Sequence, residues 1–469
     1  MAAAEVVNTS NPSSTAPETA APVNSSIPDE RSQRHSIFHT LRGFISGKRS
    51  NSYTGDRFEK ICFQLARADE PEAGIELEQP LFELTELELR INTLEGKRFM
   101  LVLPPAFDRA GLGDDEEQGA GGTCDQFIGM LPASCRKVSE KASPLGFVPK
   151  LLPFGIISKE ARYVGSCFWI WLCIVDDLTE NLLGKEWEDT EADLFLAFSK
   201  NPDASCFRNQ KSDAIRVSLA LRNVIHSTPI CSGIVDSAKE TRWRESFMEA
   251  ICEVLQGFRE ERPLLEAGRI KMYEWMRLRA ITISTRPFFI LARADLGLPP
   301  TVTALGNPLD AKYPEFLAAA AHTSDLRKVE CLLQLILGLQ NDILGWEKDF
   351  KTENPLSAIQ VLIAHGAKPQ AAMLRVINTH NELVRRCIQH AEIVCDNPPK
   401  SSHILDFDGL IASPKKPKSR VALLGSFGRT SSFNGQQIEA EKIRKYVKLI
   451  VGYGNGMAMW MAVSKRYAV

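Results

Sequence analysis

Residues 168–181 read FWIWLCIVDDLTEN, a run of eight apolar side chains that passes directly into acidic ones. The apolar run begins at 164 and is too short to span a bilayer, which requires roughly 20 residues, so it predicts a buried helix. On such a helix Asp176 and Glu180 lie one turn apart on one face, and Asp177 lies beside them. The stretch therefore predicts a helix whose apolar face leads into a cluster of carboxylates.

This acidic cluster has a chemical explanation and a plainer one. Carboxylates packed this closely repel one another, and partial burial increases the repulsion. A divalent cation relieves it, and Mg²⁺ suits the cluster because it prefers hard oxygen ligands and keeps several of its waters. An acidic helix end exposed to solvent explains the same residues, because acidic pairs are common. A metal site therefore requires a second group of ligands elsewhere in the chain.

A second predicted helix has the same design. Residues 326–350, LRKVECLLQLILGLQNDILGWEKDF, have helical apolar spacing. Asn341, Gly345 and Asp349 follow at four-residue intervals and form one slightly slanted line on the helix. Lys348 stands beside the last carboxylate, where it could bind an anion that the metal holds. Two facing helices with such stripes predict a metal cluster at one end of an apolar cavity.

The chain around these helices divides into three regions. Residues 1–57 are rich in Ser, Ala, Pro and Asn, which predicts a disordered N-terminal arm. Residues 58–124 form an N-terminal extension, in which alternating and short apolar runs predict a small strand pair before an acidic, Gly-rich linker. Long apolar-periodic runs predict an all-α bundle over 125–469, interrupted at 397–437 by a Pro- and Ser-rich loop insert.

Composition excludes several classes of function. The net charge is −2 over 469 residues, so no basic field favours a nucleic-acid partner. The 11 cysteines have neither CxxC nor zinc spacing, which favours reduced thiols and a cytoplasmic location. The N-terminus has neither region of a secretory signal, and no run is long enough for a transmembrane segment. We expect a monomer or a weak homodimer.

Four motifs, in this order, resemble those of class I terpene synthases of the microbial, fungal-type sesquiterpene cyclase group. DDLTE at 176–180 is similar to the aspartate-rich motif of that family. EWMRLRAITISTRP at 274–287 resembles the segment that carries a diphosphate-sensing arginine, with Trp275 where tyrosine is usual. NDILGWEKD at 341–349 is similar to the second metal motif, and SKRY at 464–467 resembles the closing Arg-Tyr pair.

The resemblance implies a class I terpenoid synthase helical bundle that ionises farnesyl diphosphate, a prenyl diphosphate, and cyclises the carbocation. It implies three Mg²⁺ ions. The catalytic and metal-binding positions that it implies are Asp176, Asp177, Glu180, Asn341, Gly345 and Asp349. The diphosphate-binding positions that it implies are Arg279, Lys348, Arg466 and Tyr467. Arg279 is preferred to Arg277 because it keeps the family spacing to Thr282 and Pro287.

Two departures from the family pattern keep other functions open. Gly345 replaces the usual Ser or Thr ligand and offers no side-chain oxygen, so a water would have to fill that metal position. Asp349 replaces the usual Glu. A catalytically silent helical protein with the same fold is one alternative. A chain-elongating prenyltransferase is another, although those enzymes carry two DDxxD motifs and the second motif here begins Asn-Asp.

The lining of the predicted cavity follows from the first helix. Phe168 is placed on the Asp176 stripe, where an aromatic face would steady a carbocation through cation–π attraction. Trp169, Trp171 and Trp346 are expected in the core instead, because large aromatic residues are more often core than cavity lining.

Overall fold

The computed structural model describes residues 81–107, 121–153, 155–180, 182–200, 202–230, 237–267, 270–299, 325–352, 354–399 and 433–464. The predicted N-terminal arm at 1–57 lies outside these residues, and so does most of the predicted insert, 400–432. Arg466 and Tyr467 also lie outside them.

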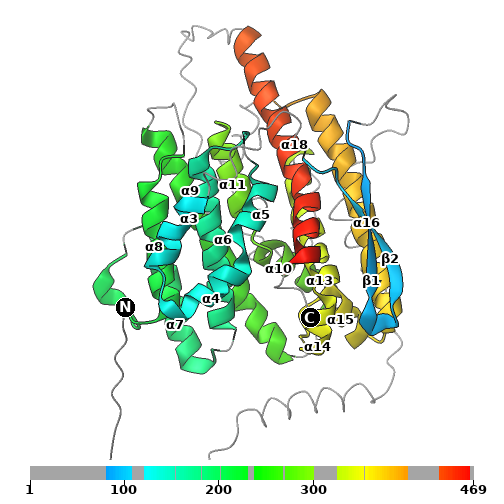
Figure 1. Cartoon of the computed structure of the whole chain (residues 1–469), viewed down its shortest axis with the longest axis horizontal. Helices are drawn as coiled ribbons and strands as arrows, with labels where there is room; N and C mark the ends of the chain where they lie inside the picture. The colour runs from blue at the N-terminus through cyan, green and yellow to red at the C-terminus, as the bar shows by residue number, and fades with distance from the viewer. Residues whose placement is uncertain are drawn as a thin grey trace, which may run out of the picture. The chain divides into compact units, whose positions relative to one another are not determined.

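The described residues confirm the predicted all-α bundle, with one hairpin added (Figure 1). Its helices are α3 (Gly121–Met130), α4 (Ala133–Ala142), α5 (Pro144–Leu151), α6 (Lys159–Thr179), α7 (Gly184–Ala197), α8 (Asp213–Ser227), α9 (Ser237–Ala267), α10 (Met272–Thr282), α11 (Arg286–Asp295), α13 (Asp325–Leu344), α14 (Trp346–Lys351), α15 (Ala358–Ala364), α16 (Pro369–Asp396) and α18 (Phe433–Val463). Short 3₁₀ turns are η1 (Asn92–Leu94) and η3 (Ala204–Cys206). Two predicted boundaries need correction: the bundle begins at Gly121 rather than 125, and helix α18 begins at Phe433, inside the predicted insert.

Helix α6 is the buried helix that the first stretch predicts. Ser158 caps its N-terminus, since the Ser158 hydroxyl accepts the Ala161 N–H at 3.2 Å. The side chains from 164 to 175 are all buried, and α6 packs against α4, α5, α8 and α11. The Trp171 indole N–H donates to the Ser218 hydroxyl of α8 at 2.8 Å, so its polar atom is satisfied inside the core. This packing fixes where the acidic end of α6 lies.

Helix α13 is the second central helix, and it packs against α10, α16 and α18. A buried ion pair holds it: the Arg293 guanidinium of α11 donates to the Glu330 carboxylate at 2.8 Å. The Tyr446 hydroxyl of α18 donates to the same carboxylate, which joins three helices at one point. Satisfied partners are what make such a buried charge tolerable.

The predicted second stripe lies on two helices rather than one. Helix α13 ends at Leu344 and α14 begins at Trp346, with Gly345 between them. The Gly345 N–H still donates to the Asn341 carbonyl at 2.8 Å, and the Asp349 N–H donates to the Gly345 carbonyl at 2.9 Å. These bonds preserve the four-residue spacing, so the stripe survives the break.

A single antiparallel hairpin, β1 (Thr85–Ile91) and β2 (Lys97–Leu103), confirms the strand pair predicted in the N-terminal extension. Strand β2 packs against α16, and the hairpin runs along that helix in Figure 1. The Asn381 side chain of α16 accepts the Val102 N–H at 2.9 Å and donates to the Met100 carbonyl at 3.0 Å. This amide satisfies backbone groups that an edge strand otherwise exposes.

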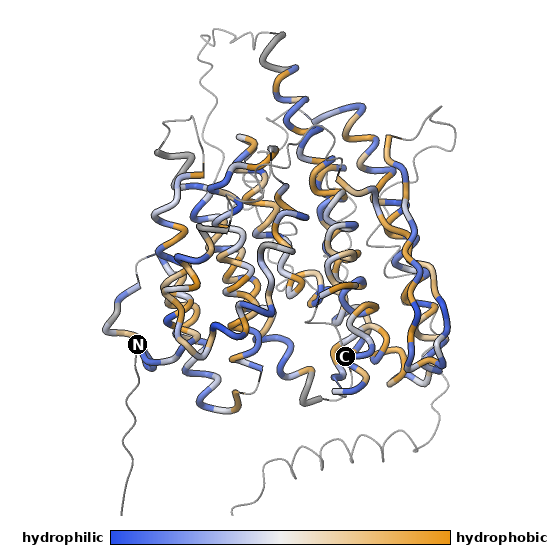
Figure 2. Tube along the Cα trace, in the orientation of Figure 1, coloured by the Kyte–Doolittle hydropathy of each residue, from blue (hydrophilic) through white to orange (hydrophobic). Residues whose placement is uncertain are grey.

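Polar and apolar residues are interspersed along the helices of the described part (Figure 2). None of those helices combines the length and the apolar character needed to cross a membrane.

Candidate active site

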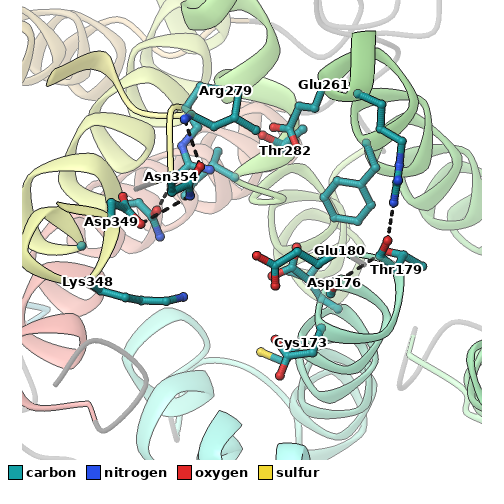
Figure 3. Close-up of a pocket in the computed structure, with 18 of the residues that line it drawn as sticks. Cys173, Asp176, Thr179, Glu180, Glu261, Arg279, Thr282, Lys348, Asp349 and Asn354 are labelled. Carbon is teal, nitrogen blue, oxygen red and sulfur yellow. Dashed lines mark hydrogen bonds between the residues drawn. The ribbon is translucent and has the colours of Figure 1, made fainter. Parts of the chain in front are cut away.

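The eight predicted site residues that the structure describes all line one cavity of about 270 Å³. This volume is near the lower end of small-molecule sites, roughly 300 Å³. Apolar lining residues include Trp169, Leu172, Phe258, Ile283, Leu356 and Met457. Among the polar ones, Asp176 and Glu180 lie on one side, and Lys348 and Asp349 lie opposite (Figure 3).

The first wall of the cavity is the C-terminal end of α6. Asp176 and Glu180 are exposed there and Asp177 is partly buried, directly after the fully buried part of the helix. Because the negative end of the helix dipole is also at the C-terminus, the helix itself disfavours these carboxylates. A cation bound between the carboxylates would offset both this effect of the dipole and the repulsion among the carboxylates.

Arg262 of α9 holds this end of α6 in place. Its guanidinium donates to the carbonyl of Thr179, the last residue of α6, and to that of Leu182 just beyond the helix. The same guanidinium lies 3.8 Å from the centroid of the Trp187 ring. Sequence reasoning missed Arg262 because its partners lie about 80 residues earlier in the chain, at a distance that no local spacing reveals.

The second wall contains Asn341, Gly345, Lys348 and Asp349. Burial raises the pKa of Asp349 to about 6, and the Asp342 carboxylate adds to this, whereas the charges of Arg279 and Lys348 oppose it. A positive ion bound beside Asp349 would stabilise the ionised carboxylate, which burial disfavours.

Arg279 of α10 contacts the same wall, whereas Arg277 does not. Arg279 donates to the Asn341 carboxamide, and its Nε lies 3.0 Å from the Asp342 Oδ1. Arg277 instead forms an ion pair with Glu260 at 2.8 Å and does not line the cavity. The choice of Arg279 over Arg277 therefore agrees with the geometry.

Asp342 has a role that sequence reasoning did not assign. It is fully buried, and it accepts the Trp275 indole N–H at 3.1 Å and the Ala358 N–H at 2.8 Å. Burial raises the pKa of Asp342, and the Arg279 guanidinium opposes that shift. This one carboxylate thereby joins α13 to α10 and to the start of α15. Trp275 supplies a donor at the position where the family usually has tyrosine.

Glu261 of α9 is a second residue that the sequence did not single out. It lines the cavity near Thr282 and Arg279 (Figure 3). Burial raises the pKa of Glu261 to about 7, and Arg279 and Thr282 oppose this. In the sequence Glu261 stands in the run REERP, which is indistinguishable from a solvated helix face.

Comparison with known proteins assigns this region to a family. Residues 167–386 match the family described as terpene synthase family 2, C-terminal metal binding. This region is therefore similar to the metal-binding domain of terpene synthases. The match begins just before the acidic end of α6, includes both walls of the cavity and ends within α16. The hairpin and α18 lie outside the match.

Individual relatives are distant. The chain is 22% identical over 293 residues to microbial terpene synthase-like protein 1 from Selaginella moellendorffii, covering 61% of this chain and 76% of the relative. The fold is similar to that of 2-methylisoborneol synthase from Streptomyces coelicolor A3(2), solved with Mg²⁺ and 2-fluoroneryl diphosphate. The TM-score is 0.52 at 12% identity, over 76% of this chain and 94% of that one. A variant of cucumene synthase gives a TM-score of 0.50 at 16% identity, over 74% and 96%.

The cavity wall corrects one prediction. Phe168 does not line the cavity but packs in the core among Trp171, Phe247 and Phe288, with ring centroids 5.5–5.8 Å away. Trp169 is buried in the core, as expected, and also lines the cavity. The reason is helical geometry: a position eight residues before Asp176 is rotated by about 80°, whereas one seven residues before is rotated by only about 20°.

The oxygen ligands of the domain suit Mg²⁺, although no closed cluster is preformed. Within the described residues, no group of three or more His, Cys, Asp or Glu side chains converges on one point. The carboxylates instead stand on two walls of one cavity. Mg²⁺ fits this arrangement because it needs one or two carboxylates per ion and takes its remaining ligands from water and phosphate oxygens.

Proposed function

We propose that the protein is a terpene cyclase that ionises farnesyl diphosphate and cyclises the resulting carbocation, with release of diphosphate. One observation carries the proposal: two oxygen-bearing walls face each other across a cavity that apolar side chains also line. The family match and the fold of 2-methylisoborneol synthase, which was solved with Mg²⁺ and a fluorinated diphosphate, support it.

The two walls would hold the metal. Asp176 and Glu180 with Asp177 beside them, and Asn341 and Asp349 opposite, would bind Mg²⁺, which supplies charge stabilisation for the departing diphosphate. Three ions are the expectation that the family resemblance gives. Gly345 contributes no side-chain oxygen, so a water would take that ligand position.

The cationic residues of the second wall would orient the diphosphate. The planar guanidinium of Arg279 suits two diphosphate oxygens at once, whereas Lys348 offers a point charge on a flexible stem. Lys348 is exposed and extends into the cavity between the walls (Figure 3). Arg466 and Tyr467 stay predicted diphosphate ligands.

The apolar residues of the cavity lining would hold the hydrocarbon chain and exclude water. Trp169 is the aromatic residue best placed to steady a carbocation, because it lies almost directly in line with Asp176. Its indole N–H is already satisfied by the Ala142 carbonyl at 2.7 Å, so the residue presents its ring to the cavity without an unpaired donor.

The deciding experiment incubates the purified protein with geranyl, farnesyl or geranylgeranyl diphosphate and Mg²⁺, and identifies volatile products by mass spectrometry. We expect a cyclic product from farnesyl diphosphate and loss of turnover in Asp176→Ala. Full activity of that variant would show that the assignment of Asp176 as a metal ligand is wrong.

Two further results would point to the alternatives. Longer prenyl chains on addition of isopentenyl diphosphate would identify a chain-elongating prenyltransferase. A flat product trace from folded protein would identify the silent helical protein that Gly345 motivates.

A further inference from the structure

Helix α14 is too short to hold its own position. It has six residues, and isolated helices of fewer than about 12 residues are marginal in water. It nevertheless carries Lys348 and Asp349 on the second wall of the cavity. Gly345, directly before it, has no side chain that could anchor the segment. Beyond the backbone hydrogen bonds that join it to α13, contacts to other elements are therefore expected to help fix its orientation.

The two residues between Gly345 and Lys348 contact the tip of the hairpin. The Trp346 indole is fully buried, and its N–H donates to the Thr93 hydroxyl at 2.8 Å. The Glu347 carboxylate accepts the backbone N–H of Asn92 and that of Thr93, the latter at 3.4 Å. Consecutive residues of one short helix thus bind η1 on one side and line the cavity on the other.

The hairpin is itself fixed to the bundle at points remote from α14. In addition to the Asn381 contacts of α16, the Asn455 side chain of α18 donates to the Thr85 hydroxyl and to the Pro104 carbonyl, both at 3.1 Å. Helix α14 is therefore tied to α16 and α18 through the hairpin, by a path that does not pass through Gly345.

We propose that the hairpin is a brace for the second metal motif, with Thr93 and Glu347 as positioning residues that hold Asp349 and Lys348 in place. The brace itself does not depend on the proposed function. Only its expected effect on the binding of metal and diphosphate rests on that function. The brace gives the N-terminal extension, which lies outside the family match, a part in building the site.

The first test measures hydrogen exchange of the full-length protein by mass spectrometry, without metal or substrate. Thr93→Val removes the acceptor of Trp346, and Glu347→Ala removes the acceptor of the η1 amides. We expect the amides of 346–352 to exchange at least about tenfold faster in each variant, with the middle of α13 unchanged.

The matched control is Lys97→Met. Lys97 also joins the hairpin to the bundle, through Gln370 of α16, but it does not contact α14. We expect this variant to exchange like the parent protein at 346–352. Unchanged exchange of that segment in both Thr93→Val and Glu347→Ala would overturn the brace. Faster exchange throughout the bundle would also overturn it, because the contacts would then support general stability only.

The second test measures the consequence for the site. Calorimetric titration with Mg²⁺ and inorganic diphosphate should show binding that is about three- to tenfold weaker in both variants, with Lys97→Met unchanged. In turnover, half-saturating Mg²⁺ should rise by a similar factor, while the rate at saturating Mg²⁺ changes less. Unaltered binding despite faster exchange would contradict a positioning role. If no prenyl diphosphate is turned over, the proposed function fails, yet the exchange result still decides whether the brace exists.

Discussion

Asn341 and Asp342 are adjacent residues with opposite surroundings. Asn341 lines the cavity, whereas Asp342 is fully buried and holds Trp275, Arg279 and the start of α15. Truncating one partner of a buried ion pair leaves an uncompensated charge and usually costs several kcal/mol. We therefore expect Asp342 to support the stability of the fold and its neighbour Asn341 to support the reaction.

Exchange of these two residues for alanine tests that separation. Asp342→Ala should lower the free energy of unfolding by about 3–5 kcal/mol, because it removes the ion-pair partner of Arg279 and the acceptor of two N–H donors. Asn341→Ala should cost about 1 kcal/mol but abolish turnover. Urea unfolding followed by circular dichroism measures the first quantity, and the product assay measures the second. Equal losses of stability in the two variants would refute the division of roles.

The raised pKa of Glu261 has a consequence for stability. The pKa is about 7 in the folded protein against 4.5 for an ordinary glutamate, mainly because of burial. Between those pH values the folded state binds more protons than the unfolded state, so this residue reduces stability as the pH rises through the window. The carboxylates of Asp176 and Asp342 contribute to the shift, and Arg279 opposes it.

Glu261→Gln should remove that pH dependence in the metal-free protein. Relative to the parent, the variant should gain about 1–3 kcal/mol of unfolding free energy between about pH 4.5 and pH 7.5, since a glutamine side chain cannot ionise. Urea unfolding at several pH values, with a chelator present, measures the difference. A difference that stays constant across this range would show that the carboxyl is not held neutral.

At the scale of elements, α13 approaches α10 closely because of one glycine. A Cβ built on Gly338 would lie 2.9 Å from the Arg279 Cγ, which is closer than side chains tolerate. Gly338 lies one turn before Asn341, so the absent side chain makes room for the arginine that contacts the second wall. Gly129 of α3 is a natural comparison, because a Cβ there meets nothing within 4 Å.

Gly338→Ala should displace Arg279 and lower turnover at least about tenfold. Its effect on stability should be small, because the gain in helix propensity, about 1 kcal/mol, offsets the displacement. Gly129→Ala should raise the free energy of unfolding by about 1 kcal/mol, because no displacement offsets the gain in helix propensity, and it should keep full turnover. The product assay and thermal unfolding measure both variants. Normal turnover in Gly338→Ala would mean that the position of Arg279 is not important for the reaction.

Sequence patterns predicted what depends on local spacing. The buried run of α6 and its acidic end follow from periods and intervals within one segment, whereas the preference for Arg279 follows from the family resemblance. The structure places the acidic end and Arg279 on one cavity. The hairpin strands were also predicted, but their docking beside Glu347 was not, because that contact joins positions about 255 residues apart. Arg262 and Asp342 were missed for the same reason, whereas Glu261 was missed because its run resembles a solvated helix face. Phe168 was misplaced because a four-residue step was repeated twice without its accumulated rotation.

At the scale of the whole molecule, the two walls belong to different parts of the bundle. Helix α6 packs among α4, α5, α8 and α11, whereas α13 packs among α10, α16 and α18. The carboxylates on these walls do not form one closed cluster within the described residues. Mg²⁺ and an anion with several oxygens are together able to bridge the walls, whereas either alone reaches only part of the site.

Mg²⁺ and inorganic diphosphate should therefore stabilise the folded protein far more together than singly. At ligand concentrations about 100 times the dissociation constant, the gain is about 2.7 kcal/mol, because the ligands bind only the folded state. Thermal unfolding with each ligand, with both and with a chelator measures it. Asp176→Ala and Asn341→Ala, one on each wall, should each lose most of the joint gain. Asp203→Ala, an exposed acid in the turn before η3, should keep it. A joint gain no larger than the sum of the separate ones would mean that the walls act as independent sites.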